Sequence, residues 1–131
     1  YERYPCPYQW ELKERVAQLR GVRKEQVFVG VGSDEAIDMI IRIFCEPGQD
    51  AVLITPPTYG MYSVSAATND VDVVKVPLEP ETFQLRVGAI LDAARDIFPA
   101  VKVVFACTPG NPTSRLLRPT DIIALLESVL T

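Results

Sequence analysis

Three segments of the sequence carry residue types that can bind an anionic, planar ligand. In GVGSDE, two glycines allow a sharp turn before a helix, and the first N–H groups of that helix can bind a phosphate at Ser33. In PPTYGMY, two prolines fix the path of the chain before Tyr59, whose ring can stack on a flat ligand. In TPGNPTS, a rigid turn projects Asn111, whose amide can donate a hydrogen bond to a ligand oxygen.

Each segment also has a purely structural interpretation, which the residues alone leave open. Ser33 can simply cap its helix, with the two acidic residues after it complementing the helix dipole. Tyr59 and Tyr62 are spaced like neighbours on one helix face and can pack in the core. Asn111 can hydrogen-bond to its own backbone in an Asx turn. A glycine pair is a weak signal, so the position of the segments in the fold decides between the interpretations.

The elements around these segments alternate between strands and helices. Short apolar or β-branched runs predict strands at Val27–Val31, Ala51–Thr55, Val71–Val76 and Val101–Cys107. Helical spacing of apolar residues predicts helices at Gln9–Leu19, from an N-cap at Ser33 to before Pro47, at Tyr59–Ala67, at Arg86–Phe98 and from Thr120 onward. This alternation predicts an α/β fold, a partial doubly wound and mainly parallel sheet with helices on both faces.

In such a sheet, ligands bind outside the carboxyl ends of the strands. Each of the three segments directly follows a predicted strand and precedes a helix or turn, so all three are expected at that edge. An anion-binding turn, a stacking ring and an amide donor together suit a planar ring that bears a phosphate and a ring oxygen. Pyridoxal 5'-phosphate (PLP) has these parts. The combination therefore predicts a PLP site.

Composition excludes several other classes of function. The sequence has no histidine, which removes histidine bases, serine–histidine triads and histidine metal sites. Its three cysteines form no CxxC pair, so we predict no metal site. The formal charge of −4 and the lack of a basic run argue against nucleic acid, and no apolar stretch is long enough for a membrane span. NAD is not indicated, because Glu35 stands where its fingerprint needs a third glycine.

Four longer strings cover nearly the whole chain: RYPCPYQ, GSDEAIDMIIRIFCEPGQDAVLI, PPTYGMYSVSA and VVFACTPGNPTS. They resemble the fold-type I PLP-dependent aminotransferases, and most closely those that act on histidinol phosphate. By this resemblance, the backbone N–H groups of Ser33 and Asp34 bind the cofactor phosphate, and Tyr59 stacks on the pyridine ring. Asn111 donates to the phenolic oxygen, and Tyr4 reaches across a homodimer interface to the phosphate of the neighbouring subunit's cofactor.

The resemblance also implies an organisation and an activity. Residues 1–22 would form an N-terminal arm and first helix, and residues 23–131 a partial PLP-binding large domain. The implied reaction transfers an amino group between L-histidinol phosphate and 2-oxoglutarate, in the cytoplasm, during histidine biosynthesis. Family members attach PLP to a lysine in a later segment, so we expect no catalytic residue in this chain and no activity from it alone.

Two alternatives to this function stay open, and the first concerns the ends of the sequence. The chain starts at Tyr1 rather than a methionine and stops within a helical pattern, so we expect both ends to be cut. It can then be a non-catalytic truncated product that acts only as a subunit-binding module. It can also belong to an aminotransferase of the same fold that acts on aromatic amino acids.

One residue departs from the family's pattern. The asparagine turn of the family usually ends in NPTG, whereas Ser114 stands at the last position here. If that position has a left-handed backbone, serine there costs about 1 kcal/mol.

Overall fold

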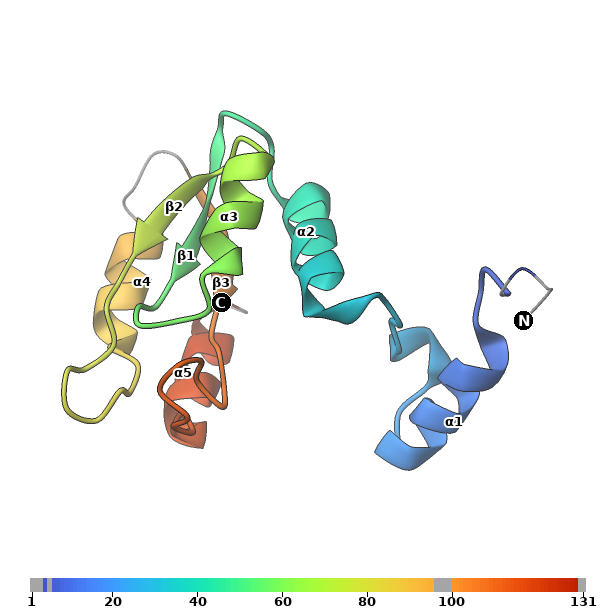
Figure 1. The fold of residues 1–131 in the computed structure, drawn as a ribbon. Coiled ribbons are helices and arrows are strands. Elements are labelled where there is room, and N and C mark those ends of the chain that lie inside the picture. Colours follow the sequence, from blue (N-terminus) through green and yellow to red (C-terminus); the bar gives the residue numbers. More distant parts are fainter. Residues whose placement is uncertain (1–3, 5, 96–99, 130–131) are drawn as a thin grey trace. The chain divides into compact units, whose positions relative to one another are not determined.

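The computed structural model describes residues 4, 6–95 and 100–129 (Figure 1). Two compact units are distinguished, Tyr1–Glu35 and Ala36–Thr131, and each is described by itself. The predicted division after residue 22 concerns the arm and the large domain of a whole enzyme, and it stays a prediction.

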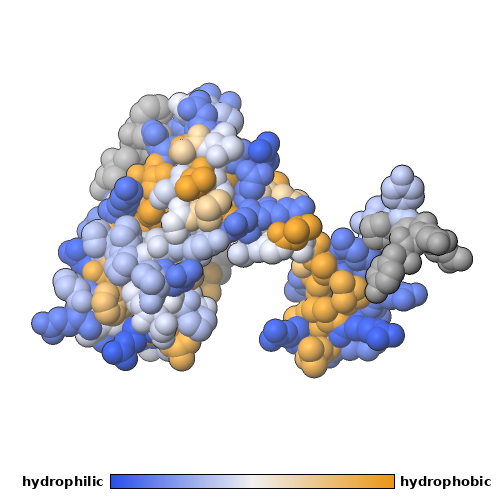
Figure 2. Space-filling model, in the orientation of Figure 1, coloured by the Kyte–Doolittle hydropathy of each residue, from blue (hydrophilic) through white to orange (hydrophobic). Residues whose placement is uncertain are grey.

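The first unit contains helix α1 (Trp10–Arg20) and the short 3-10 helix η1 (Lys24–Gln26). Helix α1 ends where predicted, because Gly21 adopts the left-handed backbone (φ 66°) that glycine tolerates best. The Lys24 ammonium lies 5.4 Å from the centroid of the Trp10 ring and 3.8 Å from the Glu14 carboxylate. These contacts hold η1 against α1. Apolar side chains also lie at the surface of this unit (Figure 2), and Val31 is 89% exposed.

The predicted strand at Val27–Val31 is wrong. The segment is not in a strand, and no described strand pairs with it. A run of β-branched residues favours extended backbone, but a strand also requires a neighbour for its N–H and C=O groups. The described sheet instead starts at the next apolar run.

The prediction that Ser33 is the N-cap of the next helix is also wrong. Helix α2 (Gly32–Phe44) begins one residue earlier, at Gly32, whose φ of 76° favours glycine. Ser33 therefore lies in the first turn of the helix. The Glu35 carboxylate reaches back and accepts a hydrogen bond from the N–H of Val31, the residue just before the helix.

The second unit is built on three parallel strands in the order β2-β1-β3. The strands are β1 (Asp50–Ile54), β2 (Asp72–Lys75) and β3 (Ala100–Phe105). The central strand is the most deeply buried, and Ala51, Val52 and Leu53 have no exposed surface. This agrees with the continuous apolar run that predicted a strand covered on both faces.

Helices cover both faces of this sheet (Figure 1). On one face, α2 and α3 (Met61–Thr68) pack against Val52 and Ile54 through Ile41 and Ala66. On the other face, α4 (Val87–Arg95) and α5 (Pro119–Val129) pack around Leu53. The predicted doubly wound α/β arrangement is confirmed. The predicted end of the fourth helix at Phe98 lies outside the described residues.

A polar contact ties α2 to the end of α3. The Asp38 carboxylate accepts hydrogen bonds of 2.7 Å from Arg42 Nε, on the same helix, and of 2.7 Å from Asn69 Nδ2, just after α3. These two bonds, with that from Arg42 the larger cause, lower the pKa of Asp38. The contact fixes the C-terminal end of α3 and, through it, the direction in which the helix leaves the loop after β1.

In the part of the chain that the structure describes, no helix is both long and apolar enough to cross a membrane. The same residues contain no cluster of three or more cysteine, aspartate or glutamate side chains suited to a metal ion.

Two isoleucines on α2 test this account of the core. Ile41 is fully buried and Ile43 is 66% exposed, so truncation removes packing only at the first. We predict that Ile41→Ala lowers the free energy of unfolding by about 2–5 kcal/mol. Ile43→Ala, the matched control, should change it by less than about 0.5 kcal/mol. Urea denaturation followed by circular dichroism measures both, and equal effects of the two variants would contradict the described packing.

Candidate functional site

The order of the strands creates a candidate site at one edge of the sheet. The chain leaves the central strand β1 toward β2 on one side, and later returns to form β3 on the other side. The last residues of β1 and β3, Ile54 and Phe105, are paired in register. The loops that follow these two strands therefore start side by side and then diverge. Crevices of this kind are where doubly wound sheets bind ligands.

The first of these loops carries Tyr59. It follows the buried Thr55 and begins with the two prolines, and α3 begins only at Met61, two residues later than predicted. Tyr59 thus lies in the loop rather than on the helix. Its ring is half-buried and packs against the core on the α2–α3 face. Beside it, the Thr58 hydroxyl is buried and finds no hydrogen-bond partner among the described residues.

Tyr62, in the first turn of α3, links the two loops. Its ring lies flat on Phe105, with centroids 4.5 Å apart and planes 12° apart. It meets the Tyr59 ring edge to face, at 5.7 Å and 89°. Burial, together with a hydrogen bond to the Cys107 side chain, raises the pKa of Tyr62 to about 12. Tyr62 therefore packs in the core, as the structural interpretation of these tyrosines proposed. Tyr59 lies at the outer edge of the same core.

The second loop carries Asn111 in a turn that backbone hydrogen bonds close. The N–H of Gly110 donates to the carbonyl of Arg115 at 2.8 Å, and the N–H of Ser114 donates to the carbonyl of Gly110 at 2.7 Å. A side chain at Gly110 would collide with Thr113, so glycine is needed there. The Asn111 side chain is exposed and forms no hydrogen bond with any described residue. The Asx turn is therefore not formed, and the amide is available to a ligand.

Gln84 anchors the far end of the second loop, a role that the sequence analysis missed. Its side chain accepts a hydrogen bond of 2.8 Å from the N–H of Arg118 and donates one of 3.1 Å to the carbonyl of Leu116. Gln84 is only 9% exposed. The sequence signal for a buried polar residue was a glutamine flanked by apolar residues. It could not identify the partners of Gln84, because they lie more than thirty positions away in the sequence.

The remaining predicted site residues belong to the first unit. Ser33 and Asp34 lie in the first turn of α2. Tyr4 is fully exposed. Tyr59 and Asn111 belong to the second unit, so the structure brings together the loops of these two. The meeting of all five residues around one ligand stays a prediction.

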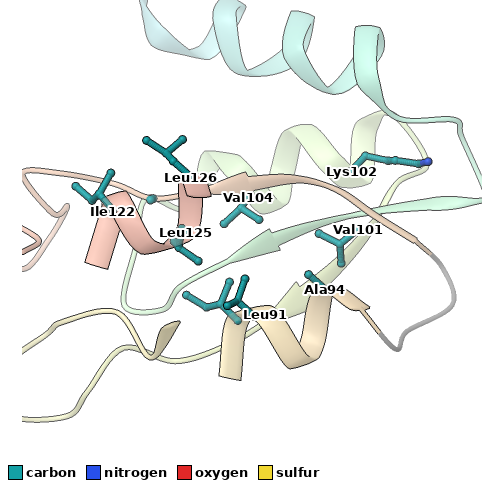
Figure 3. A pocket seen from close by; sticks show the side chains of 10 residues that line it. Leu91, Ala94, Val101, Lys102, Val104, Ile122, Leu125 and Leu126 are labelled. Carbon is teal, nitrogen blue, oxygen red and sulfur yellow. The ribbon is translucent and has the colours of Figure 1, made fainter. Parts of the chain in front are cut away.

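A separate apolar cavity of about 420 Å³ lies on the opposite face, between α4, β3 and α5 (Figure 3). Leu91, Val104 and Leu125 are among the residues that line it, and Lys102 is the charged residue at its rim. It includes none of the predicted site residues. An apolar lining offers no groups for acid–base chemistry or for binding a phosphate, so we assign the candidate site to the two loops.

Comparison with known proteins identifies the family of this chain. The model of a family described as "Aminotransferase class I and II" matches residues 1–130. The chain belongs to this family. The resemblance noted from the sequence is thereby confirmed at the level of the family.

Two similar curated proteins are named histidinol-phosphate aminotransferase. The histidinol-phosphate aminotransferase of Schizosaccharomyces pombe is 49% identical over 97% of this chain. The histidinol-phosphate aminotransferase of Parabacteroides distasonis is 47% identical over 98% of the chain. The chain spans 35% and 36% of the lengths of these two class I and II aminotransferases.

Solved structures share the fold. N-succinyldiaminopimelate aminotransferase from Mycobacterium tuberculosis matches 98% of this chain and 35% of its own chain, with a TM-score of 0.84 and 32% identity. Histidinol-phosphate aminotransferase from Sinorhizobium meliloti, solved in complex with PLP, matches 96% of this chain and 33% of its own, with a TM-score of 0.83 and 22% identity. The expected fold class, that of fold-type I aminotransferases, is therefore confirmed.

Ser114 provides a test of the turn that presents Asn111. Its φ of 55° shows that this position does have the left-handed backbone in which serine is strained. Ser114→Gly should raise the free energy of unfolding by about 1 kcal/mol, because glycine adopts this backbone without strain. Ser63→Gly, a control inside α3, should lower it by ~0.5 kcal/mol. Urea denaturation measures both variants, and a loss of stability in Ser114→Gly would contradict the described turn.

Proposed function

We propose that this chain contributes cofactor contacts to an aminotransferase that transfers an amino group between L-histidinol phosphate and 2-oxoglutarate. The observation that supports this most directly is the 47–49% identity to proteins named histidinol-phosphate aminotransferase over nearly all of the chain. The substrates are thus a phosphorylated amino alcohol and a dicarboxylic oxo acid.

The proposed cofactor is PLP, bound at the edge of the sheet beyond β1 and β3. When bound, PLP supplies the electron sink that amino transfer requires. Tyr59 would stack on its ring, and Asn111 would donate to its phenolic oxygen. The backbone N–H groups of Ser33 and Asp34 would hold its phosphate, which suits the positive end of the α2 dipole.

Three observations on the described residues support this fit. The Asn111 amide projects from a closed turn without a partner in the described chain. The ring of Tyr59 is half-buried at the same edge, so one part is held and the rest is available for stacking. The Thr58 hydroxyl, next to it, is a buried group without a partner among the described residues, as expected where a polar ligand binds.

The catalytic lysine is proposed to come from outside the 131 residues. Of the four lysines, Lys24 pairs with Glu14 and Lys102 lies at the rim of the apolar cavity. Lys75 is the last residue of β2, and Lys13 lies on α1. In this proposal the chain binds and orients the cofactor, while proton transfer depends on residues beyond it.

The proposal extends to assembly and location. Tyr4 is fully exposed, so its ring is free to reach a second subunit of a homodimer, as the family resemblance implies. Residues 1–22 would then be the arm that reaches the partner, and residues 23–131 the partial large domain. A biosynthetic enzyme with these small, charged substrates is expected in the cytoplasm.

Turnover distinguishes the proposal from its two alternatives. The full-length gene product should convert histidinol phosphate with 2-oxoglutarate at least about a hundredfold more efficiently, in kcat/KM, than phenylalanine, because a pocket built for a phosphate leaves its polar groups unpaired with an aromatic ring. Preference for phenylalanine would indicate an aromatic aminotransferase. Absence of turnover with both, in a protein that binds its own subunits, would indicate a non-catalytic module.

Asn111→Ala tests the assigned cofactor contact. We predict that it weakens PLP binding to the full-length protein about tenfold and shifts the visible absorbance of bound PLP, because one hydrogen bond to the charged phenolic oxygen is lost. The control is Asn69→Ala, which removes the amide bound to Asp38. It should lower stability without shifting the spectrum. Identical spectra for Asn111→Ala and the unmodified protein would contradict the contact.

A further inference from the structure

We propose that Tyr62 is a positioning residue that holds the Tyr59 loop and the Asn111 loop in a fixed relation to each other. This inference rests on the proposed PLP site, and it assigns to Tyr62 a role that acts through Tyr59 rather than by contact with the cofactor. Its basis is a set of three contacts that the Tyr62 side chain makes at the carboxyl ends of β1 and β3.

The first contact joins α3 to β3. The Tyr62 ring is stacked on Phe105, the last residue of the strand that leads to the Asn111 turn, at a centroid distance of 4.5 Å. Tyr62 itself begins the helix that follows the Tyr59 loop. A stack with planes only 12° apart restricts both rings, so the start of α3 cannot slide along β3 without losing the contact.

The second contact fixes the orientation of Tyr59. The Tyr59 and Tyr62 rings meet edge to face, with an angle of 89° and centroids 5.7 Å apart. The preceding prolines restrict the backbone before Tyr59, but they do not set the rotation of its ring. The edge-to-face contact can supply that restriction. A ring that must stack on a cofactor gains affinity when its orientation is already set, because less side-chain freedom is lost on binding.

The third contact reaches into the second loop. The Tyr62 hydroxyl interacts with the Cys107 side chain, and the thiol of Cys107 lies 3.5 Å from the carbonyl of Pro109. This interaction extends the link from the helix to the residues that precede Asn111.

The three contacts make separate demands on the side chain. The stack and the edge contact need an aromatic ring, which phenylalanine also provides. The contact with Cys107 needs the hydroxyl. Tyr62→Phe thus keeps the restriction of Tyr59, whereas Tyr62→Leu removes it. The ring contacts carry the proposed effect on cofactor affinity, and phenylalanine should rescue most of it.

The test is PLP binding to the full-length apo-protein, followed by the visible circular dichroism of the bound cofactor. Tyr62→Leu should weaken binding about fivefold and reduce the circular dichroism band, because the cofactor is held in a less defined orientation. Tyr62→Phe should bind within about twofold of the unmodified protein. Phe105→Leu, which removes the stacked partner and leaves Tyr62 in place, should resemble Tyr62→Leu and serves as the second variant if Tyr62→Leu does not fold.

A double-mutant cycle separates positioning from general loss of structure. If Tyr62 acts through Tyr59, then Tyr62→Leu should weaken binding no further in a Tyr59→Leu background. Ile90→Ala, which truncates a buried residue on the opposite face, is the control for destabilisation and should leave PLP affinity within about twofold.

The outcomes are distinguishable. Equal losses from Tyr62→Leu in both backgrounds, or no loss from Tyr62→Leu and Phe105→Leu in a protein that binds PLP, would overturn the positioning role and leave the proposed function intact. An unmodified full-length protein that binds no PLP would overturn the proposed function, and the positioning role with it.

Discussion

The site depends on the parallel pairing of β1 with both of its neighbours. Because the chain leaves β1 toward β2 and returns on the other side as β3, the loops after β1 and β3 start next to each other and are then drawn apart. The pairing is maintained by burial on both faces: Val52 packs toward α2 and α3, while Leu53 packs toward α4 and α5. Loss of either face would release the strand ends on which both loops are built.

On this frame, the two loops are ordered by different means. The Tyr59 loop is restricted by prolines and by a chain of aromatic contacts from Tyr59 through Tyr62 to Phe105. The Asn111 loop is closed by its own backbone hydrogen bonds and anchored by Gln84. The backbone of the second loop is strained at Ser114, and the surrounding hydrogen bonds hold this residue in its left-handed conformation. Both arrangements order the binding groups before a ligand arrives, which lowers the entropic cost of binding.

The local elements of the second unit were largely predictable from the sequence. Two elements were predicted from signals that are local in the sequence: the apolar run at Ala51–Thr55 and the helical spacing after Thr120. The strand and the start of the helix lie within one residue of the expected bounds. The predictions of a strand at Val27–Val31 and of an N-cap at Ser33 were wrong, because a strand needs a pairing partner and because the helix already begins at Gly32. The contact between Tyr62 and Phe105 could not be predicted from the sequence, because the two residues are far apart in the chain and only the fold brings them together.

The proposed function depends most on one proposed set of contacts, in which Tyr59, Asn111 and the backbone of Ser33 bind the same PLP molecule. It is tested most directly by NMR of the full-length protein, with the aromatic rings and side-chain amides labelled, during titration with PLP. We expect the resonances of the Tyr59 ring, the Asn111 amide and the backbone N–H of Ser33 to shift with one common dissociation constant, and those of residues around the cavity beside Leu91 to stay unchanged. Shifts confined to that cavity, or separate dissociation constants for Tyr59 and Asn111, would contradict it.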